Sequence, residues 1–381
     1  MKKSILIATG IYPPHIGGSA TYSSLLFREL PKRGHTAKVL TYGTASQRVA
    51  GSIYVISNSW PKGIKHFLYF LKLLEIGRRS DLILVADSSF GAAFISVIAG
   101  KILRRKIIVR VTGDYAWEQG VQRFGVKELI DDFQNKNYSL PVELLRKCQS
   151  FAVRNADLVI APSRYLKKIT EGWGVSGDKI KVIYNAVDLP DFKLSKEEAR
   201  QVLGVSGKII ISAGRLVPWK GFEMLIQAIV EAEGVIPDIK LYIIGDGPEE
   251  GNLKAQSLKL KANIFFTGTL SKDKLMQYLK AADLFALNSS YEGFSHQIIE
   301  AMSIGLVVAA ADVGGNPEVI KSGENGFLFG YNDKRAIIDI LISFFQDSAG
   351  KQALGRAAQK TVAQFSQDKM LQSLNNLFTT L

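Results

Sequence analysis

The sequence is poor in the residues that build metal centres and disulfide frameworks. Its single cysteine, Cys148, excludes an internal disulfide framework and a cysteine-based zinc site. The four histidines are widely scattered, so a histidine-built metal site is not expected. The most apolar later stretch, residues 90–103, is too short to span a bilayer, and the apolar run after Met1 is too short for a signal peptide. We therefore expect a soluble protein of a reducing compartment, such as the cytoplasm.

Acidic residues are scarce in the first half of the chain. Residues 1–190 contain 28 Lys and Arg against 14 Asp and Glu, whereas residues 191–381 contain 20 against 21. The formal net charge of +13 therefore arises from the first half. We expect that half to face nucleic acid, a membrane surface or an acidic ligand. A basic surface that only aids solubility is the alternative.

Short apolar runs alternate with longer amphipathic ones along the whole chain. The short runs lack polar–apolar alternation, so they predict strands buried on both faces of a parallel sheet. They lie at 4–8, 37–40, 81–85, 106–111, 157–160 and 181–184, and again at 208–212, 240–244, 263–267, 283–287 and 306–310. Helices are predicted at 18–32, 62–77, 90–103, 141–154 and 163–171, and at 220–233, 249–260, 271–281, 295–304 and 333–346. The alternation predicts an α/β protein of two doubly wound, Rossmann-like domains, as the chain length also suggests.

The second series of elements begins after a candidate linker. Residues 187–191 and the charged run 193–200 separate the two series, which places the domain boundary near residue 188. Residues 349–381 are expected to be helical, with no further strand. Doubly wound sheets bind ligands beyond the carboxyl ends of their strands. The two domains should therefore face a central cleft, with the chemistry in loops that follow strands.

Two of these loops carry paired glycines in front of a predicted helix. Gly17-Gly18 follows the first strand, and Gly314-Gly315 follows the strand at 306–310. Glycine lets a ligand approach the backbone closely, and a helix N-terminus attracts an anion. For Gly17 and Gly18, an ordinary turn is the alternative.

A pair of cations follows the strand at 208–212. Arg215 and Lys220 stand five residues apart, after Gly214 and before a predicted helix. Arginine offers a bidentate fork and lysine a compact charge, so the two could grip a pyrophosphate. Two ordinary surface cations are the alternative, which the position at the edge of the sheet disfavours.

Two carboxylates eight residues apart follow the strand at 283–287. Gly293 separates them, which predicts that Glu292 lies in the loop and Glu300 in the following helix. One carboxylate could meet the sugar end of a ligand and the other its nucleoside end. The amides of Phe294 and Ser295 at the helix start would then face the phosphates between them. A solvated helix face is the alternative for Glu300.

One glycine-rich segment resembles a dinucleotide-binding fingerprint. Residues 245–251 follow a strand, but their spacing is wrong. The acidic residues Asp246, Glu249 and Glu250 would repel a pyrophosphate at that helix start. We interpret the segment as a strand-to-helix turn, and a dehydrogenase is disfavoured.

Taken in order, the motifs resemble those of the retaining nucleotide-sugar glycosyltransferases of family 4, which have the GT-B fold. The likeness extends over nearly the whole chain, and the combination is specific although each motif alone is not. The motifs that carry it are Gly17-Gly18, the hinge-like segment 184–188, Gly214-Arg215, Lys220-Gly221, 245–248, Glu292 with Glu300, and 314–318.

The resemblance implies a role for each matching residue. Arg215 and Lys220 would hold the donor diphosphate, Glu292 would bind sugar hydroxyls and Glu300 would bind ribose hydroxyls. The remaining donor-binding positions would be Gly17, Gly18, Asn185, Gly214, Gly293, Phe294 and Ser295.

The resemblance also implies a domain layout and a reaction. Residues 1–187 would form the acceptor side, residues 188–365 would bind the nucleotide sugar, and residues 366–381 would form a helix that returns to the N-terminal domain. A UDP- or GDP-sugar would be the donor, the linkage would be α, and no cofactor or metal would be needed. The chain contains no Asp-x-Asp sequence that would argue for a metal.

One position departs from the family pattern. Gly113 stands where members often carry a histidine near the sugar, although the following Asp114 is retained. Asp114 is therefore a candidate catalytic residue that could contact the donor or the acceptor. A helix N-cap is an equally good interpretation of Asp114.

The acceptor should bind the basic first half. Residues 60–74 form a basic, aromatic-rich amphipathic stretch that could rest in a membrane interface, although a crossover helix packed on its sheet is the alternative. A glycan or lipid-linked acceptor of a cell-surface polysaccharide or glycolipid pathway fits this charge, with the enzyme peripheral to the inner face of the membrane. No nucleic-acid-binding motif is present. A sugar-nucleotide epimerase or hydrolase, or a catalytically degraded binding module, remains an alternative.

Overall fold

The computed structural model describes residues 2–15, 17–44, 51–187, 194–260 and 263–381. The chain divides into two compact units. Met1–Tyr184 with Asp368–Leu381 form the first unit, and Asn185–Gln367 form the second. The predicted boundary at residue 188 lies outside the described residues.

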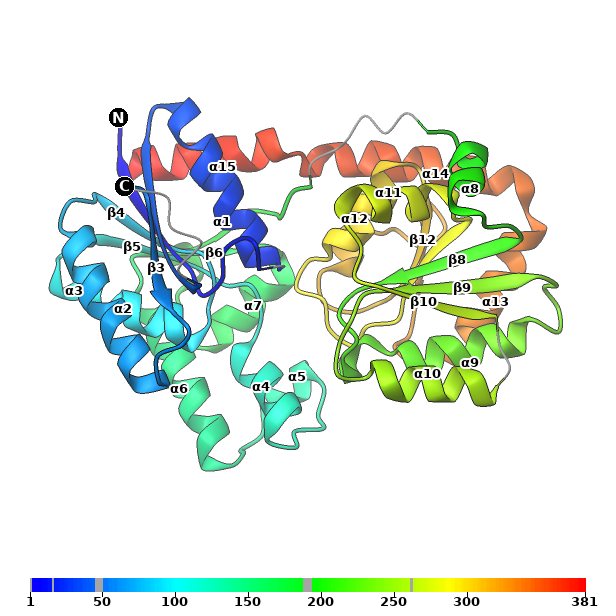
Figure 1. The fold of residues 1–381 in the computed structure, drawn as a ribbon, viewed down its shortest axis with the longest axis horizontal. Helices are drawn as coiled ribbons and strands as arrows, with labels where there is room; N and C mark the ends of the chain where they lie inside the picture. Colours follow the sequence, from blue (N-terminus) through cyan, green and yellow to red (C-terminus); the bar gives the residue numbers. More distant parts are fainter. Residues whose placement is uncertain (1, 16, 45–50, 188–193, 261–262) are drawn as a thin grey trace. The chain divides into compact units, whose positions relative to one another are not determined.

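The first unit is built on a parallel sheet of seven described strands in the order β3-β2-β1-β4-β5-β6-β7. The strands are β1 (Ser4–Ala8), β2 (Thr36–Gly43), β3 (Ile53–Ser57), β4 (Leu82–Val85), β5 (Lys106–Arg110), β6 (Leu158–Ala161) and β7 (Ile180–Val182). The helices are α1 (Gly18–Glu29), α2 (Lys62–Gly77), α3 (Ile95–Ile102), α4 (Tyr115–Arg123), α5 (Ile130–Phe133), α6 (Leu140–Asn155), α7 (Arg164–Gly172) and α15 (Gln367–Thr380). Figure 1 shows α2, α3 and α6 on one face of this sheet and α1 and α15 on the other.

The C-terminal helix α15 packs on the first unit although it is the last element of the chain. The ring nitrogen Nε2 of His35 lies 2.9 Å from Oδ1 of Asn375, and Arg33 pairs with Asp368 at 3.3 Å. Phe378 is fully buried, with its ring edge-on to His35. The first unit is therefore closed by a segment from the far end of the sequence.

The second unit repeats the architecture with a parallel sheet of six described strands in the order β10-β9-β8-β11-β12-β13. They are β8 (Lys208–Ala213), β9 (Ile239–Ile244), β10 (Ile264–Gly268), β11 (Leu284–Leu287), β12 (Val307–Ala311) and β13 (Phe327–Phe329). The helices are α8 (Lys196–Leu203), α9 (Phe222–Ala232), α10 (Glu250–Lys259), α11 (Lys272–Ala281), α12 (His296–Ser303), α13 (Lys334–Gln346) and α14 (Ser348–Val362). In Figure 1, α9, α10 and α13 cover one face and α8, α11, α12 and α14 the other. The predicted Rossmann-like architecture is confirmed in both units.

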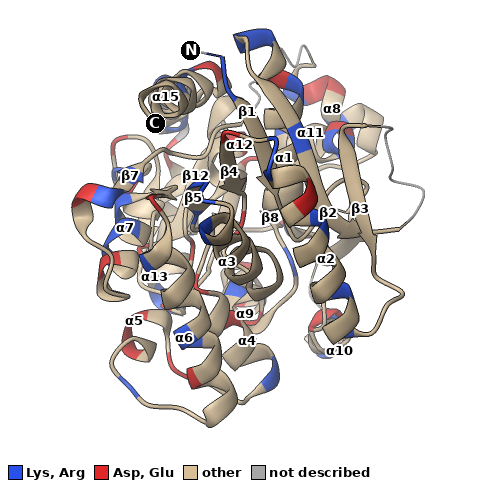
Figure 2. Cartoon of the chain, turned by 90° about the vertical axis from the view of Figure 1, so that its left-hand side faces the viewer, with Lys and Arg blue, Asp and Glu red and all other residues tan. Residues whose placement is uncertain are grey.

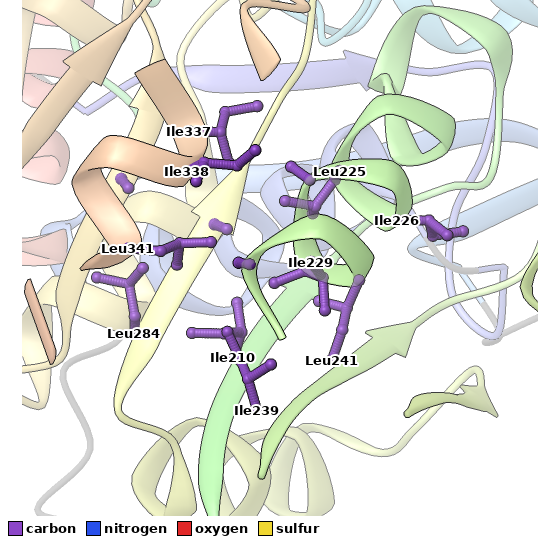
Figure 3. Close-up of a cluster of buried hydrophobic side chains, with 14 of the residues drawn as sticks. Ile210, Leu225, Ile226, Ile229, Ile239, Leu241, Leu284, Ile337, Ile338 and Leu341 are labelled. Atoms are coloured by element: carbon purple, nitrogen blue, oxygen red, sulfur yellow. The ribbon is translucent and has the colours of Figure 1, made fainter. Parts of the chain in front are cut away.

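Branched aliphatic side chains fill the space between the second sheet and its helices. Figure 3 shows isoleucine and leucine side chains from β8, β9 and β11 meeting those of α9 and α13. Ile210, Leu241 and Leu284 are fully buried, which explains why these strands are continuously apolar. This core fixes the sheet whose loops carry the candidate site.

Five of the described helices and strands were not predicted from the sequence: β3, β13, α4, α5 and α8. Strand β3 lies at the edge of its sheet with only Ile53 and Val55 buried, and β13 has three residues. The charged run assigned to the linker continues into α8, whose capping box joins Ser195 and Glu198. Polar sequence there reflects a solvated helix on the second unit, and the linker interpretation of residues 196–200 was wrong.

Candidate functional site

The order of strands in the second sheet reverses between β8 and β11. From β8 the chain proceeds to β9 and β10 on one side, and it then returns to β11, β12 and β13 on the other. Loops at such a switch point diverge and leave room for a ligand at the carboxyl edge. The loops at this edge are residues 214–221 after β8 and 288–295 after β11, which are the segments singled out in the sequence.

The loop after β8 is anchored on both sides by backbone contacts. The amide of Gly214 donates to Ile244 O at 2.9 Å, and the amide of Leu216 donates to Asp246 O at 2.7 Å. Gly245 and Gly247 have positive φ, and a Cβ on either would overlap the backbone of the 214–216 segment. The glycines of the dinucleotide-like segment therefore support this loop, and α10 starts at Glu250, as expected for a strand-to-helix turn.

A second set of contacts joins the loop after β8 to the loop after β11. Ser290 N donates to Trp219 O at 2.7 Å, and Asn288 Nδ2 donates to Gly221 O at 2.9 Å. Gly221 has φ 58°, and a Cβ there would overlap the carbonyl oxygen of Asn288. Only glycine fits this approach.

The loop after β12 closes on the same structure. Gly315 N donates to Glu292 O at 2.8 Å. Gly314 has φ 58°, and a Cβ on it would overlap that same carbonyl oxygen. The glycine pair predicted to admit a ligand thus admits another loop of the protein, and it fixes the backbone of Glu292.

These contacts bring Lys220 and Glu292 together. Lys220 Nζ lies 2.5 Å from Glu292 Oε1, and the two side chains are only 12% and 9% exposed. The lysine end also lies against Gly214, where an added Cβ would be 3.7 Å from Nζ. An ammonium has three N–H donors, so Lys220 can hold Glu292 and still donate to an anion.

Arg215 supplies a second positive charge on the same loop. Its side chain is exposed, and within the described ranges it forms no hydrogen bond or ion pair. It is available to a ligand at this edge, whereas Lys220 is already held in place. The two cations therefore differ in mobility.

The start of α12 adds backbone donors. Ser295 is the N-cap, and its hydroxyl accepts from Ile298 N at 3.4 Å. The amides of Gly293 and Ser295 donate to no other group in the described part of the chain. Phe294 is buried, with its ring 5.2 Å from that of Phe365. Such a helix start favours an anion.

Glu300 lies one turn further along α12 and is half-buried. Burial raises the pKa of its carboxyl above the ordinary value of 4.5, against a weaker opposing effect of the Lys272 charge. The solvated-face alternative does not describe this position. Partial burial is costly for a carboxylate, which makes Glu300 a candidate ligand-binding group.

The other predicted site residues are distributed over both units. Asn185 is 7% exposed and is the first residue of the second unit. Gly17 is the N-cap of α1 in the first unit, where a Cβ would contact Ile11 at 2.8 Å, while a Cβ on Gly18 would meet open space. The structure brings Arg215, Lys220, Glu292 and the start of α12 to one edge of one sheet.

Asp114 is the N-cap of α4, as one of the two interpretations anticipated. Its Oδ1 accepts from Trp117 N at 3.0 Å and from Gln149 Nε2 at 3.1 Å, and its Oδ2 accepts from Gln134 Nε2 at 2.8 Å. It is 1% exposed, and burial raises the pKa of its carboxyl. Its contact with a donor or acceptor stays a prediction, which now requires one of these bonds to be given up.

The sequence reasoning missed a hollow in the first unit. The first sheet reverses between β1 and β4, and a cavity of about 280 Å³ opens there. Asp87, after β4, accepts from Gly10 N at 2.8 Å and from Ser89 N at 3.1 Å, and so ties two loops together. An acidic residue just after the 81–85 strand was the available signal. The lining residues are Gly10, Ile11, Ser19, Asp87, Ser88, Ser89, Thr112, Gly113, Tyr115 and Glu118.

The described residues form neither a metal centre nor a membrane-crossing helix. No three His, Cys, Asp or Glu side chains come together as a metal site within these ranges. None of the helices in the part of the chain that the structure describes is long and apolar enough to cross a membrane.

Comparisons with known proteins agree with the motifs. The family described as "Glycosyl transferases group 1" matches residues 195–361, and "Glycosyltransferase Family 4" matches residues 16–190. N-acetyl-alpha-D-glucosaminyl L-malate synthase of Bacillus anthracis is 26% identical over 96% of this chain and 94% of its own. A sulfoquinovosyl transferase of Arabidopsis thaliana is 29% identical over 56% of this chain and 43% of its own.

Solved structures share the fold. HepE of Anabaena in complex with UDP superposes with a TM-score of 0.81 at 23% identity, covering 100% of both chains. HepE in complex with UDP-glucose gives a TM-score of 0.80 at 22% identity, again over 100% of both chains.

Replacing Gly314 by alanine is expected to destabilise the second unit. Gly314 and Gly323 both have positive φ, so alanine costs on the order of 1 kcal/mol in backbone strain at either position. At Gly314 the Cβ also overlaps Glu292 O, whereas at Gly323 it meets nothing within 4 Å. Urea unfolding should therefore show Gly314→Ala to be about 2 kcal/mol less stable than Gly323→Ala. Equal stabilities would contradict the interlocking of these loops.

Glu300→Gln is expected to stabilise the protein at neutral pH. The native pKa of Glu300 is raised, so the folded state binds more protons than the unfolded state between pH 4.5 and that raised value. The wild-type protein therefore loses stability as the pH rises through this window. The variant does not, because glutamine stays neutral. The gain in Tm over wild type should shrink as the pH falls toward 4.5. Glu324→Gln, at an exposed position, is the control; the same Tm profile for both variants would refute the assignment.

Proposed function

Since the chain belongs to the family 4 glycosyltransferases and has the GT-B fold, we propose that it transfers a sugar from a nucleoside-diphosphate sugar to a hydroxyl of a glycan or lipid-linked acceptor. We further propose an α linkage with retention and no metal requirement. The observation that carries the donor assignment is the buried Lys220–Glu292 pair at the carboxyl edge of the second sheet.

Breaking the sugar–phosphate bond leaves an additional negative charge on the diphosphate. Lys220 and Arg215 and the start of α12 would stabilise that charge in the transition state. Because Lys220 is already fixed by Glu292, little reorganisation is needed when the charge develops. Glu292 would accept hydrogen bonds from sugar hydroxyls, and Glu300 from the ribose.

Retention follows if the acceptor oxygen attacks the anomeric carbon from the side of the leaving group. The bond from the anomeric carbon to the phosphate oxygen breaks while the bond to the acceptor oxygen forms. A phosphate oxygen of the departing diphosphate takes the acceptor proton. This step uses no protein nucleophile, and the residues of the site act on charge and position.

A uridine donor is the best-supported choice. HepE, which shares the fold over its whole length, was solved with UDP and with UDP-glucose. The replacement of the family histidine by Gly113 affects the sugar contact and not the diphosphate site, so it bears on the choice of sugar.

The hollow in the first unit supports a hydroxyl-rich acceptor. Its polar lining consists of hydroxyls and carboxylates, with no lysine or arginine among the lining residues. Such a lining suits neutral sugar or polyol hydroxyls better than an anion. We therefore assign the positive charge of the first unit to a surface contact elsewhere.

That surface contact is a membrane, and helix α2 provides it. Ile64, Phe67 and Leu71 follow helical spacing on α2, and Trp60 lies just before the helix. All four are at least 45% exposed, so they form an unpartnered apolar stripe. Lys62 and Lys65 flank the stripe. Figure 2 shows this side of the first unit, with Lys and Arg in blue on α2 and on neighbouring segments. An apolar stripe beside lysines is the pattern of an interfacial helix.

Arg215→Ala and Lys220→Ala are each expected to lower kcat about 10²–10³-fold, because each removes charge stabilisation from the transition state. The assay follows UDP-sugar turnover with and without a polyol or glycan acceptor, in the presence of EDTA. Lys321→Ala is the control, and thermal unfolding verifies that each variant is folded. Near-normal kcat/KM in both variants, or activity that needs Mg²⁺ or Mn²⁺, would contradict the mechanism. Turnover that does not need acceptor would favour a hydrolase or epimerase, and no turnover a binding module.

Liposome flotation tests the membrane contact. The protein is expected to float with vesicles containing anionic lipid and to dissociate partly as salt rises, since each basic residue near such a surface contributes about 1 kcal/mol. Lys62→Glu with Lys65→Glu should weaken the salt-sensitive part of the binding, and Ile64→Ser with Phe67→Ser the salt-resistant part. Lys259→Glu, on the second unit, is the control. Absence of flotation at low salt would exclude the membrane assignment.

A further inference from the structure

A second cavity lies at the opposite edge of the second sheet. It has a volume of about 350 Å³ and is lined by the residues that precede β11 and β12 and by residues of α8, α11 and α14. The donor loops follow strands of this sheet, whereas these walls precede strands, so the two sites are separate. The volume falls in the range of about 300–1,000 Å³ that is usual for small-molecule sites.

The cavity is lined by four cations and by one carboxylate that is already neutralised. Asp283 accepts from Lys196 Nζ at 2.5 Å, from Arg200 Nη2 at 2.8 Å and from Ile209 N at 2.7 Å. The other three lining cations form no ion pair with any described residue; they are Lys280, Lys351 and Arg356. Residues 191–381 as a whole contain 20 basic and 21 acidic residues, so this local excess is not a general property of the unit.

Lys351 is held in a position that is unfavourable for a cation. It lies in the first turn of α14, where the helix dipole repels positive charge. Burial lowers the pKa of its ammonium; the charges of Asp283 and Asp347 act against this effect, and those of Lys196 and Lys208 add to it. Its Nζ lies 4.7 Å from the ring centre of Phe344. The ring contact is favourable, whereas the helix dipole and the burial are not, so Lys351 would gain from a bound anion.

A close helix contact brings these side chains to the wall. A Cβ on Gly355 of α14 would lie 2.5 Å from the carbonyl oxygen of Gly305, so α14 packs directly on the turn between α12 and β12. Gln359 Nε2, one turn further along α14, donates to Ser303 O at 3.3 Å. Arg356 therefore lies between Gly355 and Gln359, both of which contact the 303–305 turn, and it lines the cavity together with Lys351.

We propose that this cavity binds a phosphate-bearing anion of small-molecule size, a phosphomonoester or a pyrophosphate group, held by Lys280, Lys351 and Arg356. Arginine offers a bidentate fork to phosphate, and the lysines add compact charges. The lining residues of the cavity do not include the donor loops, so its ligand would bind at the same time as the donor, at the opposite edge of the same sheet.

Calorimetric titration of inorganic pyrophosphate into the full-length chain saturated with UDP tests the site, because UDP then occupies the donor diphosphate position. Wild type is expected to bind pyrophosphate, and Lys351→Gln with Arg356→Gln should raise the Kd at least tenfold. Lys360→Gln, a change of an exposed cation on the same helix outside the cavity, should leave the Kd unchanged. The titration is repeated with Lys220→Ala protein in the absence of UDP. Pyrophosphate binding to the cavity is then still measured if UDP does not occupy the loops around Lys220.

A parallel flotation with vesicles containing phosphatidic acid distinguishes a free phosphate from a lipid headgroup. Flotation that depends on Lys351 and Arg356, with no pyrophosphate binding, would identify the phosphate as a headgroup and support the site. Binding of neither probe, with a lower Tm in the double variant, would overturn the proposal. The cations would then only offset the carbonyl ends of α11 and α12.

Discussion

The backbone-to-backbone contact of three loops at the carboxyl edge of the second sheet is the constraint on which the candidate site depends. The loops after β8, β11 and β12 approach one another so closely that Gly221 and Gly314 have no room for a Cβ. The contact fixes the backbone of Glu292, and Glu292 in turn fixes Lys220. A lysine on an unsupported loop would be a mobile surface charge, whereas here its position is set before any ligand arrives.

Burial makes this arrangement both costly and useful. The side chains of this ion pair are about one-tenth exposed, so the two charges have lost much of their hydration. Good geometry or a functional role must offset that cost in free energy. Where water is largely excluded, such charges would act more strongly on a developing diphosphate charge than they would in water. The first unit has no such buried ion pair in its hollow, whose lining contains no lysine or arginine. Its exposed apolar stripe lies elsewhere, beside lysines. In the proposed function, donor chemistry, acceptor recognition and membrane contact therefore belong to different surfaces.

The sequence predicted the repeated α/β pattern, because buried strands are continuously apolar. It also placed the candidate site residues in loops that follow strands, which is where the structure has them. It could not show that Gly314 contacts Glu292, since a glycine that admits a ligand and one that admits another loop look alike in sequence. Strand β3 was missed because it is a half-exposed edge strand. The surroundings of Asp114 come from Gln134 and Gln149, at positions that local spacing does not connect. The cationic cavity likewise draws on α8, α11 and α14, which are far apart in the chain.

Hydrogen–deuterium exchange with and without UDP tests the central claim most directly, because it reports which backbone segments a diphosphate orders. The account predicts slower exchange in residues 214–221, 288–298 and 312–318, with only small changes around the hollow of the first unit. Protection confined to the loops after β1, β4 and β5, with the three second-unit loops unchanged, would show that the donor site has been assigned to the wrong sheet.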